Sequence, residues 1–191
     1  MKKSYIFCLL VLFAQISMAQ TDRNKEWITN NLLTQLFTPI DTVEIKNNSQ
    51  TYRMIRLSPG ITIFQNKETF YLDHVSNGSP DKEFPKVTLY KQEEIYKSFR
   101  DNISLYTNPD TLLARAPLVM YITSDMKGNI KDVLFLYVSD LNIPGYVLAN
   151  IEKEIKTKSR LIFEITPTMK MDDFMNYGCS IEKEALIPFR N

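Results

Sequence analysis

The stretch LVMYITSDMKGNIKDVLFLYV, residues 118–138, decides the fold. Apolar side chains alternate along residues 118–124, and this period of two predicts a β-strand. The turn DMKGN at residues 125–129 contains a glycine and an asparagine, two residue types that tolerate the positive φ of a tight hairpin turn. Residues 130–138 then form the return strand. The stretch as a whole therefore predicts a β-hairpin.

The return strand is apolar on both of its faces. One face carries Val133, Phe135 and Tyr137, and the other carries Leu134, Leu136 and Val138. Such a strand is typical of the centre of a sheet that is covered on both sides. Two interpretations stay open for the first face: helices of this chain cover it, or Phe135 and Tyr137 contact a partner or a second copy. Phe135 and Tyr137 are therefore the candidate binding residues.

An amphipathic helix is expected after the hairpin, over residues 144–158. Its apolar positions recur at helical spacing, at Val147, Leu148, Ile151 and Ile155. Glu152 with Lys156, and Glu154 with Lys158, have the spacing of ion pairs on an exposed helix face. A strand over residues 160–166 completes a hairpin–helix–strand unit.

The first half of the chain is expected to contain an antiparallel meander with a helix on either side. The helices are expected over residues 22–37 and 92–106, and the strands over residues 42–46, 51–57, 61–65 and 69–75. Asn-Asn-Ser and Pro-Gly turns separate the first three strands. The sequence thus predicts one α+β domain over residues 20–191, with a mainly antiparallel sheet and about three helices. This domain divides into halves at residues 20–106 and 107–191.

Residues 1–19 have the features of a cleavable signal peptide. Lys2 and Lys3 form a basic start, an unbroken apolar run covers residues 6–13, and small residues precede the cut after Ala19. The apolar run is shorter than the roughly 20 residues of a membrane-spanning helix, so we expect no retained transmembrane segment. The protein is expected to be periplasmic or secreted.

Charge and motif content narrow the classes of function. Loss of the two leader lysines changes the formal net charge from +1 to −1. A near-neutral domain provides no electrostatic basis for binding nucleic acid. The five glycines form no phosphate-binding loop. We therefore expect neither a nucleic-acid partner nor a cofactor.

Single reactive residues do not combine into a recognisable catalytic or metal site. His74 is the only histidine, which excludes a His-rich zinc site. Cys179 is the only cysteine after the leader and is typical of a buried thiol, the alternative being a thiol-hydrolase site with His74 and Asn176. Residues 125–132 lack the alternating oxygen ligands of a calcium loop. We predict no metal site and assign no catalytic residue.

The second half resembles a TonB C-terminal-type module. The matching features are a strand over residues 119–122, an Asp-x-x-Gly-x-Ile turn over 125–130, a strand over 133–138, the helix to Lys158 and a strand over 161–165. The chain lacks the Pro-rich arm of a TonB transducer, so the resemblance implies reuse of a binding fold without energy transduction. With its leader ending in Ala-Gln, the whole chain also resembles small uncharacterised secreted proteins of Bacteroidetes.

Three hypotheses about function follow. The first is a non-enzymatic envelope protein that binds a protein or a glycan through an exposed apolar or aromatic patch. The alternative is a small periplasmic hydrolase, with a deep pocket of converging polar groups around His74. The third is a structural component that oligomerises through the face carrying Phe135 and Tyr137. The absence of a catalytic motif favours the first hypothesis.

Overall fold

The computed structural model describes residues 38–58, 60–68, 86–103, 106, 117–164 and 174–186. The signal peptide expected over residues 1–19, the helix expected over 22–37 and the strand expected over 69–75 lie outside the described residues. His74 lies outside them as well.

The described chain contains a six-stranded antiparallel sheet with the strand order β1-β2-β3-β6-β5-β8. Its strands are β1 (Thr38–Asn47), β2 (Gln50–Ser58), β3 (Ile61–Asn66), β5 (Leu118–Asp125), β6 (Ile130–Val138) and β8 (Phe174–Ile181). The first three strands form the predicted meander, and β5 and β6 form the predicted hairpin. The α+β class and the mainly antiparallel sheet are thereby confirmed.

Strand β6 lies inside the sheet, as its two apolar faces predict. On one side it pairs with β5 along nearly its full length, and on the other side its Phe135–Val138 segment pairs with β3. Leu134 and Leu136 on the face away from the helices are buried, like Val133 and Phe135 on the helix side. The pairing of β3 with β6 also joins the two halves of the chain into one sheet.

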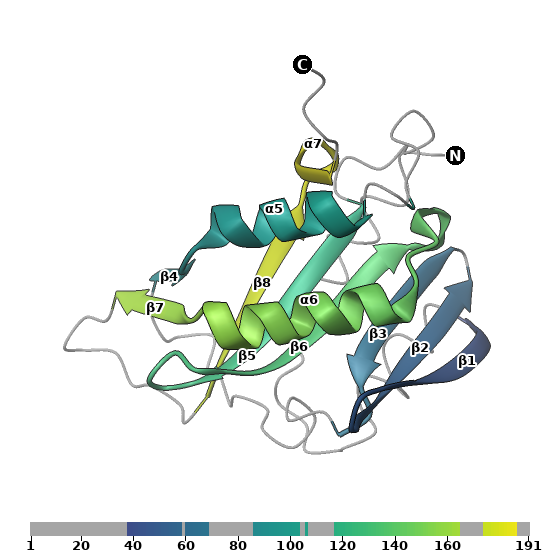
Figure 1. Ribbon diagram of the computed structural model, residues 1–191, viewed down its shortest axis with the longest axis horizontal. Helices are drawn as coiled ribbons and strands as arrows, with labels where there is room; N and C mark the ends of the chain where they lie inside the picture. The colour runs from purple at the N-terminus through teal and green to yellow at the C-terminus, as the bar shows by residue number, and fades with distance from the viewer. Residues whose placement is uncertain are drawn as a thin grey trace.

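Two helices, α5 (Gln92–Ile103) and α6 (Gly145–Lys158), lie side by side across one face of the sheet (Figure 1). The short helix α7 (Lys183–Leu186) and the 3₁₀ turn η3 (Ser139–Leu141) are the other helical segments of the described residues. The sequence predicts about three helices, which is slightly off. In the described part of the chain, two helices, α5 and α6, are longer than a single turn. Neither they nor the shorter segments are long and apolar enough to span a membrane.

A second, two-stranded antiparallel sheet consists of β4 (Lys86–Leu89) and β7 (Leu161–Glu164). The strand expected after α6 is therefore present as β7, but it pairs with β4 and not with the β5–β6 hairpin. The position beside β5 is taken by β8, which the sequence reading missed. Its alternation of Met175, Tyr177 and Cys179 with smaller or more polar residues is a period-two signal that could have found it.

The hydrophobic core lies between the helices and the sheet. Its centre is aromatic: the ring centroids of Phe99 on α5 and Phe135 on β6 are 6.0 Å apart in an edge-on contact. The ring of Phe64 on β3 lies 6.3 Å from Phe135 on the other side. Such tilted contacts stabilise the core beyond the burial of apolar area. The contact of Phe99 with Phe135 fixes α5 over the centre of the sheet, and the buried apolar residues of α6, such as Leu148 and Ile151, pack into the same core beside it.

Candidate functional site

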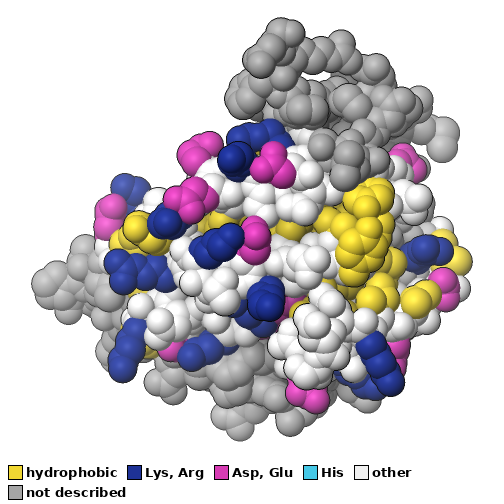
Figure 2. Space-filling model, viewed as in Figure 1, with side chains coloured by type: hydrophobic (Ala, Val, Ile, Leu, Met, Phe, Trp, Pro, Cys, Tyr) yellow, Lys and Arg dark blue, Asp and Glu magenta, His cyan; other side chains and the backbone are white. Residues whose placement is uncertain are grey.

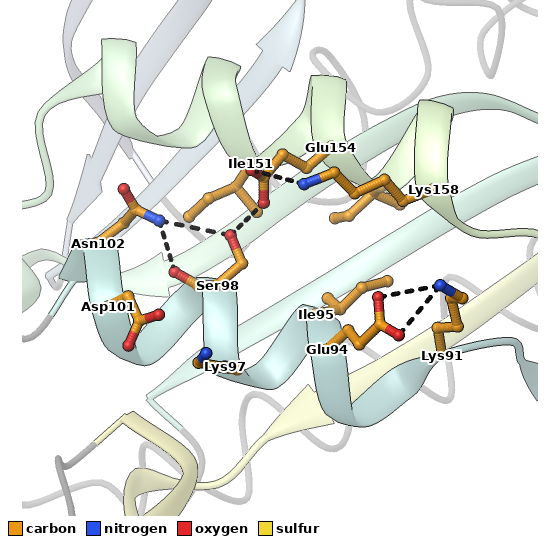
Figure 3. A pocket seen from close by; sticks show the side chains of 11 residues that line it. Lys91, Glu94, Ile95, Lys97, Ser98, Asp101, Asn102, Ile151, Glu154 and Lys158 are labelled. Carbon is orange, nitrogen blue, oxygen red and sulfur yellow. Dashed lines mark hydrogen bonds and ion pairs between the residues drawn. The ribbon is translucent and has the colours of Figure 1, made fainter.

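A groove of about 400 Å³ runs along the outer surface between α5 and α6 (Figure 3). The apolar positions of both helices point toward the sheet, so the neighbouring polar positions face each other across this groove. Its floor contains the buried side chains Ile95, Ile151 and Ile155. Its rims carry charges of both signs, from Lys91, Glu94, Lys97, Asp101, Glu154 and Lys158. The groove therefore combines an apolar floor with charged walls.

A hydrogen bond crosses the groove from α5 to α6. The hydroxyl of Ser98 donates to Oε2 of Glu154, while the ammonium of Lys158 lies 3.1 Å from Oε1 of the same carboxylate. The amide of Asn102 donates to the backbone oxygen of Ser98 at 2.7 Å. The hydrogen bond from Ser98, followed by the charge of Lys158, lowers the pKa of Glu154 despite its partial burial. Glu154 is thus an ionised acceptor whose two oxygens are already engaged.

The two ends of the groove differ in their charged side chains, although each lysine of the basic end already pairs with a carboxylate of the groove. The antiparallel helices bring Lys91 and Lys158 to one end, and Asp101 lies with Asn102 at the other (Figure 3). Beyond the basic end, the guanidinium of Arg160 lies 5.4 Å from the ring centroid of the exposed Tyr90. Lys91 is paired with Glu94 at 3.0 Å. A bound segment with an acidic group near Lys158 and a basic group near Asp101 would complement this arrangement.

The structure places the two predicted binding residues in the core. Phe135 is 0 % exposed and Tyr137 is 3 % exposed. Both side chains lie on the side of β6 that α5 and α6 cover, and Phe99 of α5 contacts Phe135 directly. Of the two interpretations of this face, the structure therefore shows the first: helices of this chain cover it. A partner cannot reach Phe135 or Tyr137 on the folded surface.

The structure also separates the residues of the conceivable thiol-hydrolase site. Cys179 is buried beneath α5, with its sulfur 3.3 Å from the hydroxyl of Tyr96, and burial raises the pKa of this thiol. Asn176 lies on the opposite face of β8 and accepts a hydrogen bond from Thr123 at 2.8 Å. Residues three apart on a strand point to opposite faces. Cys179 and Asn176 therefore do not converge, and Cys179 is a protonated core thiol.

The Asp125 segment is a hairpin turn, as predicted. Oδ1 of Asp125 accepts hydrogen bonds from the backbone N–H groups of Lys127 and Asn129, each at 2.9 Å. Partial burial raises the pKa of Asp125, but the side-chain and backbone hydrogen bonds from Asn129 outweigh it, with help from Lys131, and lower that pKa to about 2. Within the described ranges, no group of three or more His, Cys, Asp or Glu side chains is placed to hold a metal ion.

A buried ionic cluster beneath α6 corrects one expectation from the sequence. Glu152, expected on the exposed face, is 1 % exposed, and it lies close to the buried side chains of Tyr52 and Asp132. Lys156 contacts Glu152 and lies 3.9 Å from Asp132. Spacing along the helix correctly predicts the Glu152–Lys156 pair. The sequence does not reveal that α6 turns this pair toward the sheet.

Burial makes Glu152 a source of pH-dependent stability. Desolvation raises its pKa, and the opposing charge of Lys156 only partly offsets this. The folded protein thus retains a proton that the unfolded chain has lost, so stability declines as the pH rises above about 4.5. For Glu152→Gln we expect an unfolding free energy that improves relative to wild type as the pH rises, measured by urea denaturation at several pH values.

The neighbouring carboxylate on α6 is the matched control for this prediction. The pKa of Glu154 is lowered, so its ionised form contributes stability above the ordinary Glu pKa that is lost as the pH falls. Glu154→Gln should therefore become less stable relative to wild type as the pH rises. The prediction would be contradicted if the unfolding free energies of Glu152→Gln and wild type differed by the same amount at every pH.

Taken together, the described chain is a small α+β protein with a charged groove between two helices on one face of an antiparallel sheet. Its fold is similar to the crystal structure of a DUF5043 family protein from Bacteroides uniformis ATCC 8492. The two share 13% sequence identity at a TM-score of 0.51, and the match covers 74% of this chain and 91% of that chain.

At 13% identity, this structural similarity shows a shared fold. The similar protein comes from a Bacteroides species, which agrees with the resemblance to uncharacterised proteins of Bacteroidetes. Neither a family model nor a curated protein matches the sequence. The comparisons give the TonB-type resemblance no support.

Proposed function

We propose that this protein is a non-enzymatic binding module of the bacterial envelope and that it binds a segment of a partner protein in the groove between α5 and α6. One observation carries the proposal: an apolar floor lies between charged rims on two adjacent helices. Ile151 and Ile155 are themselves buried beneath this floor, so an apolar side chain of a partner would be desolvated mainly against the aliphatic stems of the rim side chains. Charged groups beside it would meet the charged ends of the same side chains. The envelope location rests on the leader over residues 1–19.

The chemistry of the lining favours a protein segment over a glycan. No Phe, Tyr or Trp is among the described residues that line the groove, whereas an aromatic platform is the feature that would indicate a glycan ligand. A polypeptide supplies apolar groups and charges of both signs within a few residues. The opposite charges at the two ends of the groove, Lys158 and Asp101, would also select the direction in which the segment lies.

The polar groups of the groove support binding more than catalysis. A general acid near neutral pH needs a raised pKa, and the pKa of Glu154 is lowered. The same lowering makes Glu154 a weak base toward Ser98, which donates its hydrogen bond to it. The hydrolase alternative therefore gains no support from this groove, and its proposed centre at His74 lies outside the described residues.

The proposal can be tested with a displayed library of short peptides, selected on the purified protein. Enriched peptides should place an apolar residue next to charged residues. Their affinity, measured by fluorescence polarisation, should fall about tenfold for Lys158→Glu, because the reversed charge removes an attraction and adds a repulsion. Lys158 lies on the groove rim and is exposed, so its substitution should leave the fold intact.

The matched control is Lys153→Glu, an exposed lysine on the same helix that does not line the groove. Its affinity for the same peptides should stay within about twofold of wild type. Equal losses in the two variants would indicate a nonspecific charge effect. Failure to enrich any peptide would argue against a protein segment as the ligand.

A further inference from the structure

Strand β1 forms one edge of the six-stranded sheet and has no strand partner on its outer side among the described residues. Its register against β2 shifts once, between Pro39 and Asp41, and then continues without interruption to Asn47. Proteins usually protect such edges with prolines, bulges or repeated lysines, because unpaired N–H and C=O groups are a template for another strand. Beyond its bulge, β1 has a single lysine, Lys46, and no proline.

Exposed apolar side chains accompany this open edge. Ile40 is 68 % exposed and Val43 is 42 % exposed, and both belong to β1. On the helix side the strand is packed tightly against the start of α6, where a Cβ on Gly145 would lie 2.2 Å from Cδ1 of Ile45. The next residue of α6, Tyr146, is also exposed. Figure 2 shows the resulting apolar surface beside the N-terminal end of α6. The edge therefore continues into a surface that pairing would partly bury.

The charges of β1 select an antiparallel register with a second copy of the same strand. Ile45 packs toward α6, so Glu44 and Lys46 both point to the opposite face of the sheet. If Ile45 lies opposite Ile45 of the second copy, each Glu44 faces a Lys46 and two identical ion pairs form across the twofold axis. A slip of two residues in one direction would set Glu44 against Glu44, and in the other direction Lys46 against Lys46.

We propose that two copies of this chain associate through antiparallel pairing of their β1 strands, with Glu44 of each copy opposite Lys46 of the other. The two six-stranded sheets then become one continuous sheet, and Val43 and Tyr146 of each copy flank the junction. Within one copy, Glu44 lies 2.8 Å from Lys67 and 3.8 Å from Arg53, whereas Lys46 is exposed and ion-pairs with no described residue. Lys46 is thus the cation left available to a second copy.

The association is independent of the proposed groove function, because β1 contributes no residue to the groove lining. The test measures the mass of the exported, purified protein by sedimentation equilibrium over a wide concentration range. The wild type should approach the mass of two chains. Glu44→Lys and Lys46→Glu should each weaken self-association about tenfold, because each places like charges opposite one another at both symmetric positions.

An equimolar mixture of these two variants provides the decisive measurement. In the mixed pair, the two lysine side chains on β1 of the first variant face the two glutamate side chains on β1 of the second. The mixture should therefore recover the wild-type strength of association, which neither variant reaches alone. Lys127→Glu, an exposed site in the β5–β6 turn that does not line the groove, is the charge control and should dimerise like wild type. A monomeric wild type, variants that dimerise unchanged, a mixture that stays monomeric, or assemblies growing beyond two chains would each overturn the proposal.

Discussion

Replacing Gly128 with Ala should lower the free energy of unfolding by about 3 kcal/mol or more. Gly128 has φ +81, where an L-residue with a Cβ is strained. A Cβ at this position would also lie 2.0 Å from the backbone oxygen of Leu161. That backbone cannot move away freely, because the N–H of Leu161 donates to the oxygen of Gly128 at 2.9 Å. The substitution would therefore separate the hairpin turn from the start of β7.

Gly60 provides a matched control for the Gly128 substitution. Its φ is +85, nearly that of Gly128, but a Cβ there would have no neighbour within 4 Å. Gly60→Ala should cost only the conformational strain, about 1 to 2 kcal/mol. Urea denaturation of both variants would isolate the steric contribution at Gly128. Equal losses would show that the contact with Leu161 does not constrain the turn.

Replacing Phe135 with Ala should lower the free energy of unfolding by about 3 to 5 kcal/mol. The side chain is fully buried between Phe64 and Phe99, so its removal leaves a cavity at the point where α5 meets the sheet. The same measurement decides between the two interpretations of the β6 face. If Phe135 lay on an exposed binding surface, its replacement by Ala would lower the free energy of unfolding only slightly.

Tyr146→Ala is the comparison for this prediction, because Tyr146 is 52 % exposed at the start of α6. Its loss should cost less than about 1 kcal/mol, even though its hydroxyl shares a hydrogen bond with Tyr106. Urea denaturation, with circular dichroism to confirm the native fold, measures both. A loss for Phe135→Ala as small as that for Tyr146→Ala would place Phe135 outside the core.

Most individual elements of the described fold could be predicted from local patterns. The hairpin of β5 and β6, the first three strands and both long helices follow from spacings that repeat within a few residues. The α6 helix, expected over residues 144–158, is observed at Gly145–Lys158. Strands β4 and β8 were not predicted: β4 is too short for a clear period, whereas β8 carries a period-two alternation that could have revealed it.

The candidate site was harder to predict than the fold. Phe135 and Tyr137 were correctly recognised as one apolar face, but their strand alone cannot show which element covers that face. The groove contains Ser98 and Glu154, which are 56 residues apart in the chain and have no shared sequence motif. Each looks like an ordinary exposed helix residue. They become neighbours only because α5 and α6 pack side by side on the same sheet.

The sequence by itself determined where most of the described strands and both long helices form and that β6 belongs inside a sheet, because side-chain periodicity is a local property of the chain. Only the tertiary structure decided that β7 pairs with β4, that β8 completes the main sheet, and that Glu152 is buried. It also decided that the covered face of β6 meets helices of the same chain. These features depend on which distant elements pack together. The hydrophobic effect is non-directional and favours the arrangement in which the whole chain buries the most apolar area, so no single segment of the sequence indicates that arrangement.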